Sequence, residues 1–242
     1  MDLLVQNGLN ILFSDRSGGV SSGTFSGMNL SRFVGDSAAD VETNRQLLKN
    51  KLRTNVLVSS EQIHGDRILL VDDELKQDHE ADGYDGLITR QKHIAIMVQL
   101  ADCQGVLLHD PTTETVAAVH CGWRGNVANI LGTSVRQMKI FANSKASDIH
   151  AWISPSLGPC CAEFIHYKKE LPQEFWQFQT RDHYFDLWQI SKWQLNEVGV
   201  PESQITLPSA CTCCSEHYFS YRRAKKLGDG VTGRHCAAIM LR

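Results

Sequence analysis

Three side chains that commonly bind transition metals fall at the ends of predicted elements: His64, Cys103 and His120. His64 lies in the break between two apolar runs, Cys103 lies between two further runs, and His120 ends another. Strand ends and the loops beyond them are where α/β proteins gather catalytic groups. Two imidazoles and one thiolate are a known catalytic zinc set that leaves a fourth position open. Because zinc lowers the pKa of water bound there to about 7, this triple predicts a catalytic zinc centre.

Other metal-binding sets remain open, since the chain contains 10 histidines and 8 cysteines. The strongest competitor is Cys211-Thr212-Cys213-Cys214 with His217 nearby, as a structural zinc site. Cys160 and Cys161 could form a reactive pair, but buried thiols are the simpler interpretation. Adjacent cysteines suit a disulfide framework poorly, so we expect free thiols, most of them packed in the core.

Short apolar runs predict the strands that must position these residues. They are Ile11–Phe13, Asn55–Val58, Ile68–Val71, Gly86–Ile88, Ile94–Val98, Val106–Leu108, Val116–His120, Ala151–Ile153 and Ala237–Leu241. Helical spacing predicts three helices: one beginning near Ser37, one after Asn126 as its N-cap, and one over about Leu187–Val198 that stops at Gly199. Helices among many strands indicate a mixed α/β (α+β) fold. Without a linker or repeat, we expect one catalytic domain over residues 1–242.

The composition is that of an ordinary globular protein with 42% hydrophobic and 21% charged residues. A net charge of -3 and a pI of about 6.4 lack the basic excess typical of nucleic-acid-binding proteins. The N-terminal segment has no basic region and its apolar run is broken by Gly8, unlike a signal peptide. We therefore expect a cytoplasmic protein with a small-molecule partner, no nucleic acid and no membrane, as a monomer or small homo-oligomer.

Ordered motifs along nearly the whole chain resemble those of the polyphenol oxidase or laccase-domain family. That family includes the bacterial peptidoglycan editing factor and zinc-dependent purine nucleoside phosphorylases. The matching strings are Thr24-Phe25-Ser26-Gly27-Met28-Asn29-Leu30-Ser31, Gln62-Ile63-His64-Gly65, Ala101-Asp102-Cys103, Val119-His120-Cys121-Gly122-Trp123-Arg124-Gly125, Ser156-Leu157-Gly158-Pro159, Phe219-Ser220-Tyr221-Arg222-Arg223 and Thr232-Gly233-Arg234.

The resemblance implies a metal bound by His64, Cys103 and His120, with Zn2+ favoured over copper. It also implies a single-domain mixed-sheet sandwich with flanking helices, similar in outline to some cysteine-dependent deamidases. The implied activities are phosphorolysis of adenosine, inosine or methylthioadenosine and deamination of adenosine, with a purine nucleoside and phosphate as partners.

Seven further residues are candidates for the site. We expect Asp102 to act in general acid/base catalysis or to orient a ligand, the alternative being a carboxylate that accepts backbone N–H bonds in a turn. Arg124, before a predicted helix, would suit a phosphate oxygen, the alternative being a salt bridge. The expected substrate-binding residues are Asn29, Arg45, Gln62, Tyr221 and Arg222. For Arg45 the alternative is a solvated helix arginine, and for the two amides it is loop capping.

The chain departs from the family pattern beside the presumed pocket. Leu100 and Gln104-Gly105 flank the Ala101-Asp102-Cys103 string where the family has threonine and Leu-Pro, and Cys121 replaces an alanine. The family's Tyr-Glu-Val-Gly segment is not recognisable in Ala162-Glu163-Phe164-Ile165. These changes leave the metal set intact but put the substrate in doubt.

Three other functions therefore stay open. One is a zinc hydrolase that edits peptidoglycan precursors. Another is a copper-dependent phenol oxidase, since two histidines and a cysteine are also a blue-copper set, although no His-x-His pair is present. The last is a non-enzymatic binding protein that has kept the fold, which the complete ligand triple argues against.

Overall fold

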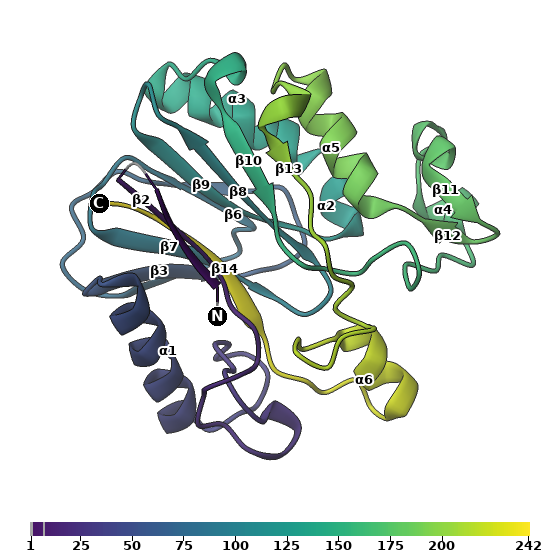
Figure 1. The fold of residues 1–242 in the computed structure, drawn as a ribbon, viewed down its shortest axis with the longest axis horizontal. Coiled ribbons are helices and arrows are strands. Elements are labelled where there is room, and N and C mark those ends of the chain that lie inside the picture. The colour runs from purple at the N-terminus through teal and green to yellow at the C-terminus, as the bar shows by residue number, and fades with distance from the viewer. Residues whose placement is uncertain (1, 7) are drawn as a thin grey trace.

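The computed structural model describes residues 2–6 and 8–242 and contains two large mixed β-sheets that pack face to face (Figure 1). In spatial order, the first sheet consists of β1 (Asp2–Gln6), β2 (Leu9–Phe13), β14 (His235–Leu241), β7 (Ile94–Leu100), β3 (Val56–Glu61) and β5 (His79–Asp82). The second consists of β13 (Ile205–Thr206), β10 (His150–Ile153), β8 (Gln104–Asp110), β9 (Thr115–Cys121), β6 (Gly86–Thr89) and β4 (Ile68–Val71). A separate ribbon pairs β11 (Gln179–Arg181) with β12 (Tyr184–Phe185).

The central strands are mostly apolar, with polar residues at or near their ends, because both faces of each sheet are covered. Every residue of β7 and of β9 is buried. Successive side chains point to opposite faces of a strand, so alternate residues contribute to different cores. Ile96 and Val98 of β7 pack between the sheets with Leu107 and Ala118, whereas Ala95 and Met97 face away from the second sheet. The tight core between the sheets fixes the strand ends that carry the candidate ligands.

Helices cover the outer faces of the sandwich. On the first sheet lies α1 (Ala38–Leu52), whose Leu48 and Leu52 pack in one cluster with Met97. On the second sheet lie α3 (Ile130–Ala142) and α5 (Leu187–Glu197), as Figure 1 shows. The shorter helices are α2 (Trp123–Val127), α4 (Tyr167–Glu170), α6 (Tyr221–Leu227) and the 3-10 turns Gly23–Phe25, Ala146–Asp148, Gln173–Phe178 and Glu202–Gln204. The predicted mixed-sheet sandwich with flanking helices is confirmed.

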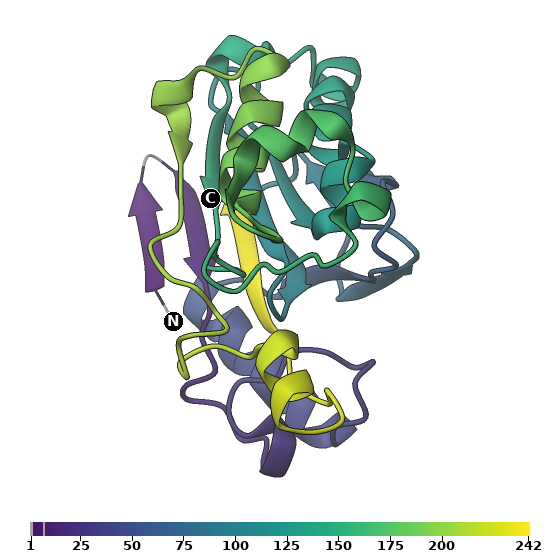
Figure 2. The ribbon, with the colours of Figure 1, turned by 90° about the vertical axis from the view of Figure 1, so that its right-hand side faces the viewer.

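The view turned by 90° shows that α6 lies beside the loops between β2 and α1 (Figure 2). The backbone N–H of Leu30 donates to the carbonyl of Arg234, and that of Arg16 donates to the carbonyl of His217. Segments separated by about 200 residues of sequence therefore meet at one end of the sandwich. Within the part of the chain that the structure describes, no helix is long and apolar enough to cross a bilayer.

All nine predicted strands are confirmed, and so are two of the three helices. The first helix begins after the N-cap Ser37, and the last ends at Glu197, with Gly199 at a φ of 98° just beyond it. The predicted start of the middle helix is wrong. The chain first forms the short α2, and α3 then begins at Ile130, where the side chain of Asn129 accepts from the N–H of Gly132 at 3.1 Å.

Asn126 does not cap a helix because it is buried within α2. Its side-chain amide donates to Ser191 Oγ at 2.9 Å and to Gln194 Oε1 at 3.0 Å, both on α5. Asn126 therefore joins α2 to α5, and the cap of α3 is the side-chain oxygen of Asn129, three residues later, which accepts the N–H of Gly132.

Candidate functional site

The crossover from one sheet to the other positions Cys103. Strand β7, in the first sheet, ends at Leu100, and strand β8, in the second sheet, begins at Gln104. The connection between them consists of Ala101-Asp102-Cys103 alone. Strand β9 returns antiparallel to β8 and places His120 opposite Gly105. His64 comes from the loop between β3 and β4. The ligand atoms of His64, Cys103 and His120 all lie within 4.8 Å of one another, so the fold brings together the three predicted ligands.

Asp85 is a fully buried carboxylate that orders two of these three residues. Its Oδ1 lies 2.8 Å from Nδ1 of His120. The same oxygen accepts the backbone N–H of His64 at 2.9 Å, and Oδ2 accepts that of Gly65 at 2.7 Å. A carboxylate on one imidazole nitrogen is the usual partner of a metal-binding histidine, because it fixes the ring and leaves the other nitrogen for the metal.

Close contact between Cys103 and its neighbours also shapes the triple. A Cβ built on Gly122 would lie 2.9 Å from Cys103 Sγ, so the residue after Cys121 must be glycine for the thiol to keep its place. The imidazole rings of His64 and His120 meet edge to face, with centroids 4.8 Å apart. His120 is buried and His64 is exposed, so the triple opens to one side.

The charges of the triple favour a thiolate. Burial raises the pKa of Cys103, but the charge of His120 and hydrogen bonds with His120 and His64 outweigh it and lower the pKa to about 6. Burial likewise lowers the pKa of His120, while Cys103 and Asp85 raise it to about 9. The pKa of Asp85 is lowered: burial opposes ionisation, but the hydrogen bond and charge of His120 prevail. Without metal, the pair is therefore thiolate and imidazolium near neutral pH.

The triple lies in a pocket of about 830 Å³. Aromatic and cationic side chains line it together: Phe33, Trp123, Phe164, Tyr221, Arg124, Arg222 and Arg234. The Arg124 guanidinium lies 4.3 Å from the centroid of the Trp123 ring, and no ion pair of Arg124 is found among residues 2–6 and 8–242. The alternative of a loop-fixing salt bridge at Arg124 is therefore wrong for the described residues.

Asp102 lines the pocket with both carboxylate oxygens engaged. Oδ1 accepts from Thr212 Oγ1 at 2.7 Å, and Oδ2 accepts the backbone N–H of Arg222 at 2.6 Å. Its φ of 87° turns the chain sharply before Cys103. Asp102 therefore tethers the loop before α6 to the turn that carries Cys103. This arrangement fits the alternative of a carboxylate that accepts a backbone N–H, although the partner is distant in sequence.

The expected substrate-binding residues differ in position. Gln62, Tyr221 and Arg222 line the pocket, but both ends of the Gln62 amide are bonded to the backbone of Gln99, at 2.9 and 2.7 Å. Asn29 is buried outside the lining, where its amide donates to Asp36 at 2.8 Å. For both amides the contacts agree with the loop-capping alternative.

Arg45 also lies outside the pocket lining. Its guanidinium is 2% exposed and contacts Glu80 at 2.5 Å, the carbonyl of Leu30 and the hydroxyl of Ser59. The alternative of a solvated helix arginine is wrong, because α1 turns Arg45 inward. Its partners are all protein groups, and we leave Arg45 and Asn29 out of the site proposed below.

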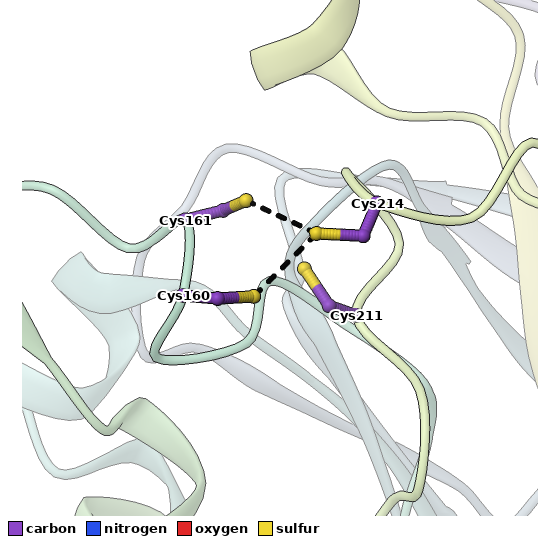
Figure 3. Close-up of side chains that lie close together, drawn as sticks. All are labelled: Cys160, Cys161, Cys211 and Cys214. Atoms are coloured by element: carbon purple, nitrogen blue, oxygen red, sulfur yellow. Dashed lines mark hydrogen bonds between the residues drawn. The ribbon is translucent and has the colours of Figure 1, made fainter.

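The expectation that most cysteines pack in the core is wrong: only Cys121 and Cys236 are buried. Cys160 is exposed and Cys161 half-buried, which also corrects the interpretation of this pair as buried thiols. Together with Cys211 and Cys214 they form a second group whose sulfur atoms lie within 4.8 Å of one another (Figure 3). Cys213 and His217, part of the competitor predicted from the sequence, are not members of this group.

Sequence reasoning missed two residues of the site. Asp85 carried one signal, a carboxylate directly before the wholly buried strand β6, but its partners lie about 20 and 35 residues away. Arg234 was noticed only within a motif, and its place in the pocket depends on the C-terminal segment returning past the crossover. No local sequence pattern therefore predicts the contacts of Asp85 or the position of Arg234.

Comparison with known proteins identifies the family to which the chain belongs. A sequence model of the family described as multi-copper polyphenol oxidoreductase laccase matches residues 10–242. The chain is 30% identical to a purine nucleoside phosphorylase of Bacteroides thetaiotaomicron, over 93% of this chain and 89% of that protein. It is 32% identical to purine nucleoside phosphorylase YlmD of Geobacillus stearothermophilus, over 93% and 87%.

Solved structures show the same architecture. Hypothetical protein YfiH of Bacillus licheniformis has a TM-score of 0.87 at 28% identity, covering 97% of this chain and 93% of that one. YlmD of Geobacillus stearothermophilus has a TM-score of 0.86 at 31% identity, covering 97% and 92%. The resemblance drawn from the sequence motifs is confirmed, and the chain belongs to the multi-copper polyphenol oxidoreductase laccase family.

Proposed function

We propose that the chain is a zinc-dependent enzyme that cleaves purine nucleosides with phosphate. The observation that carries this proposal is the position of the His64, Cys103 and His120 triple, which opens on a pocket with both aromatic and arginine side chains. Relatives that share about 30% of their residues over nearly the whole chain are named purine nucleoside phosphorylases. The partners we propose are therefore a purine nucleoside and inorganic phosphate.

The donor set fits zinc. Two imidazoles and one thiolate lie within 4.8 Å of one another, and Asp85 occupies Nδ1 of His120 so that its Nε2 is available. A zinc ion held there would act as a Lewis acid and lower the pKa of water at an open position. The low pKa of Cys103 supplies the deprotonated ligand that binding requires.

The pocket walls suit the two halves of the reaction. Trp123, Phe164 and Tyr221 offer rings against which a purine can stack. Arg124 and Arg222 offer guanidinium groups, whose planar donors match phosphate oxygens. In phosphorolysis an oxygen of phosphate bonds to C1′ of the ribose while the bond from C1′ to the purine nitrogen breaks. Side chains that hold the base and the phosphate on either side of C1′ favour this displacement.

Asp102 and α6 organise the rim of the pocket. Because Asp102 accepts the N–H of Arg222, it fixes the start of α6, where Tyr221 and Arg222 both face the pocket. The Arg222 guanidinium in turn donates to the carbonyl of Glu163 at 3.2 Å. We propose that Asp102 positions these residues and does not itself exchange protons with the substrate.

Copper-dependent phenol oxidation is the second candidate, because the family description names it. A blue-copper site adds a weak axial methionine to two histidines and a cysteine. Met28, Met97, Met138 and Met240 all pack in the cores, and none of them lines the pocket. Among the described residues, the donor set therefore favours zinc.

The test is product analysis on purified protein, both as isolated and after removal of metal followed by addition of zinc or copper. Adenosine and inosine are incubated with and without phosphate. We expect the free base and ribose 1-phosphate only when phosphate is present, and only with metal bound. Inosine formed from adenosine without phosphate would add the deamination implied by the resemblance. Failure to cleave any nucleoside, with turnover of phenols by the copper form or of peptidoglycan precursors by the zinc form, would overturn the proposal.

A further inference from the structure

Four cysteines from two loops converge at one point outside the pocket. Cys160 and Cys161 lie in the loop after β10, and Cys211 and Cys214 lie in the loop before α6 (Figure 3). The Sγ atom of Cys214 lies 3.5 Å from that of Cys160 and 3.4 Å from that of Cys161. All four sulfur atoms lie within 4.8 Å of one another.

We propose that Cys160, Cys161, Cys211 and Cys214 bind a zinc ion in a closed structural site, separate from the triple in the pocket. A tetrahedral zinc with zinc–sulfur distances of about 2.3 Å separates its sulfur atoms by about 3.8 Å. The two shortest separations, 3.5 and 3.4 Å, are slightly below that value and no pair exceeds 4.8 Å, so a zinc ion needs only small movements of the thiols. Four thiolates fill the coordination sphere and leave no position for a substrate.

Hydrophobic packing does not account for this cluster. The thiols of Cys160 and Cys214 are exposed, and those of Cys161 and Cys211 are half-buried, whereas cysteines that only fill a core are buried. Cys161 packs against the apolar cluster around Phe164, but the exposed thiols of Cys160 and Cys214 gain little from apolar contact. A metal ion is the partner that this chemistry selects, since thiolates favour zinc among the common divalent ions.

The backbone holds the two loops at the distance such a site requires. Cys211 and Cys214 have the C-x-x-C spacing of one half of a structural zinc site. A parallel bridge joins Ser156 to Cys211, and the N–H of Gly158 donates to the sulfur of Cys211 at 3.2 Å. A Cβ on Gly158 would lie 3.0 Å from Cys211 Cβ, so glycine permits the loops to approach.

Two arginines lie around the cluster and suit its negative charge. Four thiolates with one Zn2+ carry a net charge of about -2. Arg181 donates to the carbonyl of Cys160 at 3.1 Å, and Arg223 donates to the carbonyls of Thr212, Cys213 and Ser215. Their guanidinium groups hold the loop backbone and place positive charge beside the thiolates.

The site would stabilise the wall of the pocket. Thr212, between two of the cysteines, donates to Asp102, and the N–H of Leu157 donates to the carbonyl of Asp102. Both cysteine loops are thus attached to the residue that precedes Cys103. A zinc ion that joins these loops would hold the Asp102 turn from two sides.

The experiment counts zinc in full-length protein purified under reducing conditions and passed over a chelating resin. We expect two zinc ions per chain in the wild type, one in Cys103→Ala, one in Cys214→Ser and none in the double variant. Cys213→Ser is the matched control and should keep both ions, because this neighbouring thiol is outside the cluster. Loss of all zinc in Cys103→Ala, or equal zinc in Cys103→Ala and the double variant, would overturn the proposal.

A second measurement does not depend on how the Cys214 variants fold. The Cys103→Ala protein is alkylated with and without added zinc, and the modified peptides are identified by mass spectrometry. Zinc should slow modification of the four cluster cysteines and leave that of Cys213 unchanged. Equal rates at the four thiols with and without zinc, or a disulfide among them in the reduced protein, would contradict the proposal. This second readout, in which the pocket ligand Cys103 is already replaced, depends neither on the pocket site nor on its function.

Discussion

The two groups of metal-binding side chains are built on different supports. His64, Cys103 and His120 gather where strands of both sheets end, and the buried Asp85 orders two of them. The second group consists of Cys160, Cys161, Cys211 and Cys214, which come from two loops that backbone hydrogen bonds hold together.

The difference in ligand number accompanies a difference in surroundings. The triple leaves coordination open beside a pocket of about 830 Å³, whereas four thiolates complete a tetrahedron on their own. Three ligands beside a pocket leave a coordination position open for catalysis. Four ligands between two loops leave none, and a metal ion bound there would stabilise the loops. The two groups meet at Asp102, which precedes Cys103 and accepts a hydrogen bond from Thr212.

The largest effect that separates the two groups is expected from Asp85→Asn. The amide can no longer accept bonds at both oxygens from His120, His64 and Gly65, so metal affinity in the pocket should fall about 10–100-fold. Competition titration against a chelator measures this change.

Asp110→Asn is the matched control, because this buried carboxylate lies at the opposite end of β8 and accepts from Thr112 and Thr113. It should lower the free energy of unfolding while leaving metal affinity unchanged. An Asp85→Asn protein with wild-type affinity would show that the carboxylate does not support the pocket site.

The next effect concerns the charge of Cys103 in metal-free protein. Because its pKa is lowered to about 6, the thiolate is present above that pH and is lost as the pH falls through it. Alkylation of Cys103 should therefore be half-maximal near pH 6. At pH 7 it should be about 2–4-fold faster than that of an ordinary thiol, because the larger thiolate fraction is partly offset by the lower nucleophilicity of a thiolate with a low pKa.

Peptide mass spectrometry after a short exposure to iodoacetamide gives the rate, with buried Cys121 as the internal control, since burial raises the pKa of its thiol. A midpoint near pH 9 for Cys103 would mean that the imidazoles do not stabilise its thiolate.

These two predictions show what sequence patterns can and cannot supply. Continuous apolar runs predicted β7, β8 and β9, and with them the strand ends that carry Cys103 and His120. Strand β5 has the sequence His-Glu-Ala-Asp, which has no such pattern, and it forms because it pairs with β3 at the sheet edge. Asp85 and the pairing of Cys160 with Cys214 depend on contacts between distant segments, so no local spacing reveals them.

A smaller effect is expected from Asp102→Asn, the residue shared by both groups. An asparagine keeps one acceptor oxygen for the N–H of Arg222 and can contact Thr212 only by donating its NH2 to the hydroxyl, so both charge-assisted hydrogen bonds are lost. We expect KM to rise several-fold as Tyr221 and Arg222 shift, with the pH profile of kcat unchanged. Loss of one limb of that profile, with a fall in kcat of about 10²–10⁴-fold, would instead identify Asp102 as a general acid or base.

The measurement that tests the central claim most directly compares Cys103→Ala with Cys121→Ala for bound zinc and for phosphorolysis. Cys121 follows His120 and borders the pocket, but it is buried and packs in the core beyond the second sheet. It is not part of the ligand triple, so its replacement should leave both quantities near those of the wild type. Cys103→Ala should lose one zinc ion per chain and all phosphate-dependent release of the base while remaining folded. A Cys103→Ala protein that keeps its full zinc content, or still cleaves nucleosides at the wild-type rate, would contradict the assignment of the site.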